Sequence, residues 1–209
     1  MGKPAMDLEE LAQLVMRTDA RQQLGELISR YGMAVDDRDF AALGALFAPD
    51  GEFNGVKGRQ TIVDFYRART ATFTISTHYA HGWHFNFESD TRASGVVNAH
   101  AELCIAGKTI RISLRYLDQY VKDAQTWMFQ SRKLQFRYVL PLDEVADGLD
   151  QAVRVRWPGT QPQAADLPDK LQTYIDSLGA RVPGALPPNA QPAASQALHF
   201  RPADGVGPA

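Results

Sequence analysis

The stretch Ile28–Phe53, ISRYGMAVDDRDFAALGALFAPDGEF, contains two apolar stripes with helical spacing. The first stripe passes through Tyr31 and ends at Val35, and the second begins at Phe40. Pro49-Asp50-Gly51 is typical of a turn and predicts the end of the second helix. We therefore predict an amphipathic helix interrupted by its acidic residues, which are Asp36, Asp37 and Asp39.

Further helices are expected on both sides of this stretch. Upstream, Leu8–Val15 forms a short apolar stripe that we expect to break near Thr18-Asp19, where Asp19 would cap the following helix. Downstream, an apolar stripe from Ile62 to Tyr66 predicts a third helix, which ends near Thr70.

After these helices the apolar period changes from helical spacing to strict alternation. Residues 93–105 are apolar at the odd positions, which indicates a long strand with one buried face. We expect a strand before it at about 79–88, and two after it at 110–116 and 127–140. Helices followed by long consecutive strands predict an α+β fold, with the helices packed on one side of a strongly curved antiparallel sheet.

The composition changes again at Pro141. Ten of the twelve prolines lie at this residue or later, and most of the segment shows no periodicity. We expect Trp157 to dock on the domain, a short helix between Asp166 and Gly179, and a loosely held tail. The sequence thus divides into an N-terminal helical segment (1–19), a main domain (20–140) and a C-terminal proline-rich extension (141–209).

Charge and composition exclude several classes of function. The net charge is −2 and Lys and Arg form no run, so nucleic-acid binding is disfavoured. Cys104 is the only cysteine, which rules out an intramolecular disulfide and a cysteine-based metal site. No apolar segment approaches the length of a membrane span or of a signal core. These features favour a cytoplasmic protein without a membrane partner.

Five short motifs, in order, resemble the SnoaL-like branch of the nuclear transport factor 2-like superfamily, which includes scytalone dehydratase and bile-acid 7α-dehydratase. They cover about residues 20–140. The motifs are Tyr31-x4-Asp36 with Arg38-Asp39-Phe40, then Leu46-Phe47-Ala48-Pro49-Asp50-Gly51, Thr77-His78, Asp90-Thr91-x-Ala93, and Trp127 followed by Arg132.

The resemblance implies a cone-shaped α+β barrel with an apolar pocket and no metal or organic cofactor. It assigns the catalytic roles to Tyr31, Asp36 and His78. An imidazole held by a carboxylate can remove a proton and return it to a leaving hydroxyl, while a tyrosine donates to a developing oxyanion. The alternative reading is a solvated acidic cluster, with one aspartate capping the helix at Phe40, and Tyr31 in the core.

Four further residues are candidates for substrate binding. Tyr116 lies on the inner face of its predicted strand, and Arg137 falls near an arginine of the dehydratases. Trp83 and Phe53 could line an aromatic pocket, or belong to the core. The sequence departs from the dehydratases at Ala101 and Leu103, where some family members carry a second histidine or aspartate.

Two other histidine patterns are weaker candidates. His78-x2-His81-x2-His84 invites a metal-site interpretation, but on a regular strand His81 faces away from the other two, and no carboxylate ligand accompanies them. We therefore expect no metal. His100 falls on the polar face of its strand, opposite the predicted pocket.

The leading functional hypothesis is a cofactor-independent lyase that acts on a hydrophobic aromatic or polycyclic hydroxylated substrate. Dehydration is the default reaction; passage through a quinone methide with release of formaldehyde, as in lignin-derived diarylpropane lyases, is a related one. The alternatives are an isomerase or cyclase of the polyketide or steroid type, and a non-catalytic binding module or oxygenase small subunit. The resemblance also implies a homodimer or homotrimer.

Overall fold

The computed structural model describes residues 7–179. They belong to two compact units, of which the first ends at Leu171 and the second begins at Gln172. The first unit contains four α-helices, one short 3-10 helix and six strands. Its helices are α1 (Leu8–Asp36), α2 (Phe40–Ala45), α3 (Arg59–Thr70), η1 (Leu142–Glu144) and α4 (Val145–Gly148). Its strands are β1 (Phe47–Phe53), β2 (Val56–Lys57), β3 (Phe73–Phe87), β4 (Arg92–Ile105), β5 (Lys108–Asp123) and β6 (Thr126–Pro141).

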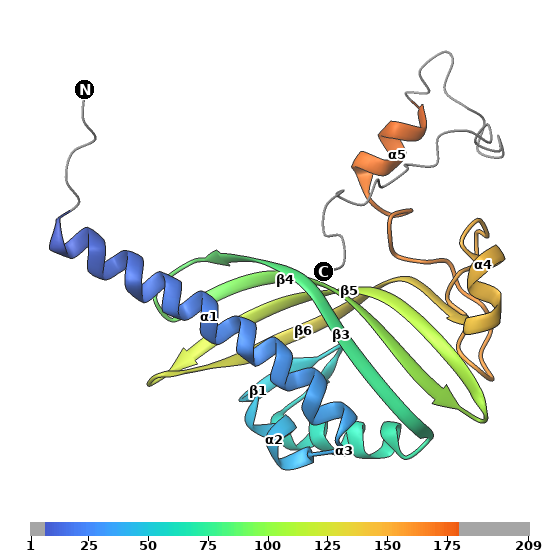
Figure 1. The fold of residues 1–209 in the computed structure, drawn as a ribbon, viewed down its shortest axis with the longest axis horizontal. Coiled ribbons are helices and arrows are strands. Elements are labelled where there is room, and N and C mark those ends of the chain that lie inside the picture. Colours follow the sequence, from blue (N-terminus) through green and yellow to red (C-terminus); the bar gives the residue numbers. More distant parts are fainter. Residues whose placement is uncertain (1–6, 180–209) are drawn as a thin grey trace, which may run out of the picture. The chain divides into compact units, whose positions relative to one another are not determined.

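The six strands form one open, mixed sheet in the order β2-β1-β6-β5-β4-β3. The four long strands β3 to β6 are antiparallel neighbours, as the alternating sequence predicts. The strand β1 runs parallel to β6, so the sheet is mixed and not purely antiparallel as predicted. Figure 1 shows α1 crossing the curved sheet, with α2 and α3 near its C-terminal end. The predicted α+β architecture is confirmed.

Helix α1 is continuous from Leu8 to Asp36, so the predicted break near Thr18-Asp19 is wrong. The true start is Asp7, which forms a capping box with Glu10. Both polar residues at the expected break are accommodated within the helix. The Thr18 hydroxyl donates to the carbonyl of Leu14 at 2.8 Å, and the Asp19 carboxylate accepts from the Gln23 side chain at 2.6 Å.

The predicted interruption after α1 is present, but the second helix ends earlier than expected. The side chain of Asp39 caps α2 by accepting from the backbone N–H of Ala42 at 2.9 Å. Pro49-Asp50-Gly51 is not a turn and lies inside β1, at a point where the pairing of β1 with β6 shifts register between Phe47 and Glu52. Only glycine fits at Gly51, where a Cβ atom would lie 3.0 Å from a backbone oxygen of Ala48.

The core lies between α1 and the inner face of the sheet. The odd-numbered residues of β4 are buried from Ala93 to Leu103, and the inner face of β5 is buried from Ile110 to Tyr120. Helix α1 contributes its buried face from Leu24 to Val35. Tyr31 lies in the middle of this layer and is 4 % exposed, so α1 positions its C-terminal turns over the sheet.

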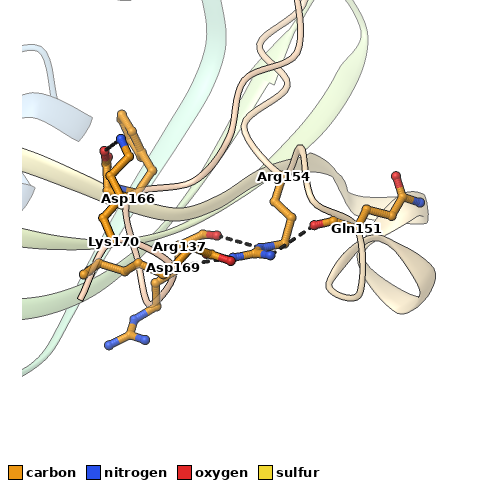
Figure 2. Close-up of polar contacts among 8 residues, drawn as sticks. Arg137, Gln151, Arg154, Asp166, Asp169 and Lys170 are labelled. Carbon is orange, nitrogen blue, oxygen red and sulfur yellow. Dashed lines mark hydrogen bonds and ion pairs between the residues drawn. The ribbon is translucent and has the colours of Figure 1, made fainter. Parts of the chain in front are cut away.

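The first part of the C-terminal extension packs against the end of β6. Arg154 donates to the backbone carbonyls of Arg137, Gln151 and Leu167 and forms an ion pair with Asp169 (Figure 2). Trp157 docks as expected: its ring centroid is 5.9 Å from that of Phe136, and the guanidinium of Arg69 lies 4.8 Å from it.

The second unit begins with α5 (Gln172–Gly179), which is shorter than the helix predicted from Asp166. Residues 166–171 instead join the first unit, since the Asp166 carboxylate accepts from the backbone N–H of Phe136 at 2.9 Å and Leu167 is fully buried. The predicted tail lies outside the described residues. Among residues 7–179, no helix combines the length and the apolar character that crossing a membrane requires.

Candidate active site

Asp36 and His78 form a close pair between the end of α1 and β3. The His78 Nδ1 atom lies 2.6 Å from Asp36 Oδ1, and the backbone N–H of His78 donates to Asp36 Oδ2 at 2.7 Å. The hydroxyl of Ser76 donates to Asp36 Oδ1 at 2.9 Å. Three bonds fix the carboxylate, and the carboxylate in turn fixes the imidazole with Nδ1 toward Asp36.

The local fold explains why residues 42 positions apart meet. Asp36 is the last residue of α1, and the backbone leaves the helical path at Arg38, whose φ is 58°. One turn earlier, α1 lies close to β3 at Gly32, since a Cβ atom added there would lie 3.4 Å from the Cβ of His78. The helix end thereby places the carboxylate against the strand.

The environment of Asp36 favours its charged form. Partial burial alone would raise its pKa, but the hydrogen bond and charge of His78, together with the bond from Ser76, outweigh that effect and lower the pKa below its usual value. A carboxylate therefore faces Nδ1 across the pH range in which an imidazole titrates. Such a pair holds the tautomer in which Nδ1 carries the proton and Nε2 is the basic nitrogen.

Three tyrosines lie beneath the Asp36–His78 pair. Tyr31 on α1 makes a short hydroxyl–hydroxyl contact with Tyr66 on α3, and its ring centroid is 5.9 Å from that of Tyr116 on β5. The ring of Tyr31 also lies 6.4 Å from the imidazole of His78. Burial raises the pKa of all three phenols, so they remain protonated and can donate hydrogen bonds.

Arg132 on β6 lines the site, although the sequence analysis names Arg137 as the candidate arginine for substrate binding. Its guanidinium lies 4.2 Å from the ring centroid of Tyr31 and 4.1 Å from that of Tyr116. It forms two hydrogen bonds to Asp118, at 2.9 and 2.8 Å, and both side chains are almost completely buried. Although burial opposes its charge, Asp118 raises the pKa of Arg132, so the guanidinium stays charged.

A sequence signal for this ion pair exists. Asp118 shares the alternation phase of Leu114 and Tyr116, which puts a carboxylate on the inner face of β5. A buried carboxylate needs a cation opposite, and Arg132 is its direct partner in the β5–β6 register.

Five of these residues line a cavity of about 470 Å³. Of the predicted site residues, it brings together Tyr31, Asp36, His78 and Tyr116, and it adds Arg132. A larger hollow of about 1200 Å³ lies beside the N-terminal turns of α1, next to Phe87 and Trp127. It contains no histidine, so we assign the candidate active site to the smaller cavity.

The other three candidates for substrate binding do not line this cavity. Phe53 is buried behind it, with its ring centroid 4.9 Å from that of Tyr66. Trp83 is 46 % exposed and packs beside Gly25 of α1. Arg137 falls at a register shift of β6 against β5 and offers its carbonyl to Arg154 (Figure 2). The arginine of the cavity is thus Arg132, five positions earlier than expected.

The other histidines of the sequence patterns lie in different places. His84 is exposed and lies outside the cavity. His81 does line it and contacts His100 on β4, with His81 Nε2 2.6 Å from His100 Nδ1. Within residues 7–179, no group of three or more His, Cys, Asp or Glu side chains has the arrangement needed to hold a metal ion.

Comparison with known proteins defines the class. Residues 16–133, more than half of the chain, match the model of the SnoaL-like domain, so the chain belongs to the SnoaL-like domain family. This family lies within the nuclear transport factor 2-like superfamily, which confirms the predicted relationship. A search of curated proteins finds no match.

Solved structures share the fold at low sequence identity. A candidate scytalone dehydratase from Novosphingobium aromaticivorans is 17 % identical with a TM-score of 0.59, over 71 % of this chain and 99 % of the other. The hexachlorocyclohexane dehydrochlorinase LinA-type3 from Novosphingobium barchaimii is 20 % identical with a TM-score of 0.58, over 63 % and 95 %. A further LinA structure is 22 % identical with a TM-score of 0.59, over 63 % and 95 %.

Proposed function

We propose that the protein is a cofactor-independent lyase in which His78 and Asp36 are the acid/base pair. The observation that carries the proposal is the Asp36–His78 contact of 2.6 Å inside a cavity floored by neutral phenols and a charged arginine. The family relationship supports lyase or isomerase chemistry, since the similar structures include proteins named as a dehydratase and as dehydrochlorinases.

The reaction begins with proton removal. With Nδ1 bound to Asp36, His78 uses Nε2 to take a proton from the substrate, either from a carbon next to the leaving hydroxyl or from a phenol conjugated to it. The electron pair released forms a new double bond, and the carbon–oxygen bond to the hydroxyl breaks. The imidazolium returns its proton to the departing hydroxide, which leaves as water. Asp36 stabilises the imidazolium between the two transfers.

The cavity floor would stabilise negative charge on the substrate. Tyr31 is protonated and donates a hydrogen bond to an oxygen on which charge develops. Arg132 is held beneath it by Asp118 and adds a fixed positive charge without moving. Because the arginine is almost fully buried, we propose that it acts through Tyr31 and Tyr116 rather than by binding a substrate anion directly.

We infer that the substrate is an aromatic hydroxylated molecule. Aromatic rings from α1, β5 and β6 surround the floor, and a cavity of about 470 Å³ is large enough for a drug-sized ligand. A diarylpropane diol is the specific candidate. After loss of water to a quinone methide, deprotonation of its hydroxymethyl group would break the adjacent carbon–carbon bond and give a stilbene and formaldehyde.

A panel of phenolic alcohols and diarylpropane diols tests the proposal. Each reaction is followed by the mass of the product, by formaldehyde and by stilbene absorbance. Loss of one water supports the lyase, and water loss with formaldehyde supports the diarylpropane version. A product of unchanged mass would instead identify an isomerase or cyclase, and the absence of turnover across the panel would favour a binding module.

A further inference from the structure

Helix α3 places the hydroxyl of Tyr66 deep in the core. The buried residues of this helix are spaced as the side chains on one face, and they are Ile62, Val63, Tyr66 and Thr70. Tyr66 is 6 % exposed and does not line the cavity, so a substrate held at His78 does not touch it. Packing on Phe53 accounts for the ring of Tyr66. Its hydroxyl needs a separate explanation.

The hydrogen-bond partners of this hydroxyl define a direction. Within residues 7–179 its one partner is the hydroxyl of Tyr31 on α1. A phenol hydroxyl has one hydrogen to donate and can also accept. If Tyr31 donated to Tyr66, the hydrogen of Tyr66 would be buried without an acceptor, which is unfavourable. If Tyr66 donates, both hydroxyls are satisfied, because Tyr31 lines the cavity and its own hydrogen can reach solvent or a ligand there.

The electrostatics of the two phenols agree with this direction. Burial raises the pKa of both groups. The charge of Arg132 and the hydrogen bond with Tyr66 then lower the pKa of Tyr31, whereas the contact with Tyr31 raises the pKa of Tyr66 further. Tyr31 is therefore the phenol of the pair that carries negative charge more easily, and a more acidic phenol is a stronger hydrogen-bond donor.

We propose that Tyr66 is a positioning residue that donates to the hydroxyl of Tyr31 and thereby directs the hydrogen of Tyr31 at the substrate oxygen. The substrate touches only Tyr31. As negative charge develops on a phenolate or enolate oxygen, Tyr31 donates more strongly, its own oxygen gains electron density, and the bond from Tyr66 strengthens with it. The inference deepens the proposed function and rests on it in one respect, that Tyr31 faces the oxygen on which charge develops.

Binding of 4-nitrophenolate tests this tyrosine relay, Tyr66 to Tyr31 to ligand oxygen, without any turnover. The absorbance of the ligand reports binding at a pH at which it is ionised in solution. We expect Tyr31→Phe to weaken binding by roughly tenfold to a hundredfold, and Tyr66→Phe to weaken it by about threefold to tenfold. Nitrobenzene, which has the same ring without the anionic oxygen, should bind equally to all variants.

A double-variant cycle separates positioning from a structural role. In the Tyr31→Phe protein, Tyr66→Phe should cause no further loss, because its effect passes through the hydroxyl that is already absent. A purely structural role would weaken binding in both backgrounds and would weaken nitrobenzene as well. Tyr138→Phe is the matched control, since Tyr138 lies on β6 and does not line the cavity. It should bind 4-nitrophenolate as the wild type does.

A second measurement needs no substitution and covers the case in which Tyr66→Phe does not fold. The wild-type protein is labelled with carbon-13 at the Cζ atom of tyrosine and titrated with each ligand. The Tyr66 signal should shift with 4-nitrophenolate, although the ligand does not touch that ring, because the bond to Tyr31 strengthens. Nitrobenzene should leave the Tyr66 signal in place.

Four results would overturn the inference. They are an equal loss from Tyr66→Phe in both backgrounds, no loss in either, a Tyr66 signal that does not move with 4-nitrophenolate, and no binding of that ligand at about 10 mM. The outcome is separable from that of the proposed function. A coupled loss in a protein that converts no alcohol of the panel would contradict the lyase and retain the relay. An active lyase whose kcat is unchanged by Tyr66→Phe would retain the lyase and contradict the relay.

Discussion

At the scale of single residues, the site depends on two charged groups that reach the cavity in different ways. Asp36 is a helix-terminal residue that remains partly open to solvent, with its side chain 21 % exposed. Arg132 is sealed inside the sheet and balanced by Asp118. The first group orients the imidazole of His78, and the second places a positive charge beneath the tyrosines, so the two respond differently to substitution.

Asp36→Asn should lower the free energy of unfolding, relative to the wild type, by more at neutral pH than in acid. The folded pKa of Asp36 is lowered, so its stabilising effect is fully present above the unfolded pKa of about 3.9 and is lost as pH falls through the folded value. Urea unfolding at pH 7 should show a loss of about 1–3 kcal/mol that shrinks at pH 3. Asp37→Asn, at an exposed neighbour, serves as the control. An equal loss at both pH values would contradict the assignment.

Arg132→Met should destabilise the fold by about 3–5 kcal/mol, because it leaves the Asp118 carboxylate buried without a cation. The double variant Arg132→Met with Asp118→Leu removes both charges and should recover most of that stability. On an active substrate it should remain impaired, since the cavity floor would have lost its fixed positive charge. Chemical unfolding and steady-state rates measure both. Full activity in the stable double variant would show that Arg132 has only a structural role.

At the scale of elements, the sequence predicted the periodic helices and strands well, but it predicted the residues at which they end less well. The interruption after α1 was visible because Asp36, Asp37 and Asp39 fall between two apolar stripes. The end of α2 was misplaced because Pro49-Asp50-Gly51 resembles a turn, whereas its place in β1 depends on a strand contributed by residues 126–141. Long-range pairing of this kind leaves no local signal.

The C-terminal extension offers a test at the same scale. Arg154→Ala removes the hydrogen bonds and the ion pair that tie residues 151–169 to β6 (Figure 2). We expect a loss of about 1–3 kcal/mol and faster proteolysis between residues 142 and 171. Lys170→Ala removes an exposed ion pair and should change stability by less than about 1 kcal/mol. Equal proteolysis of both variants would contradict the role of Arg154.

At the scale of the whole molecule, a change of apolar period was enough to predict the fold class. Helical spacing up to Thr70 and alternation from residue 93 onward left an α+β arrangement as the simplest solution. The meeting of Asp36 and His78 followed from the family resemblance, because nothing in local spacing joins residues so far apart. The resemblance to the dehydratases pointed to Arg137, whereas β6 shifts register twice against β5 and pairs Arg132 with the buried Asp118.

In the proposed mechanism, the imidazole held by Asp36 carries out the proton transfers. The most direct measurement compares kcat/KM of the wild type, His78→Gln and the control His84→Gln on whichever alcohol of the panel is converted. The acid/base mechanism predicts a loss of about 10²–10⁴-fold for His78→Gln and no loss for His84→Gln. Turnover by His78→Gln at the wild-type rate would contradict it.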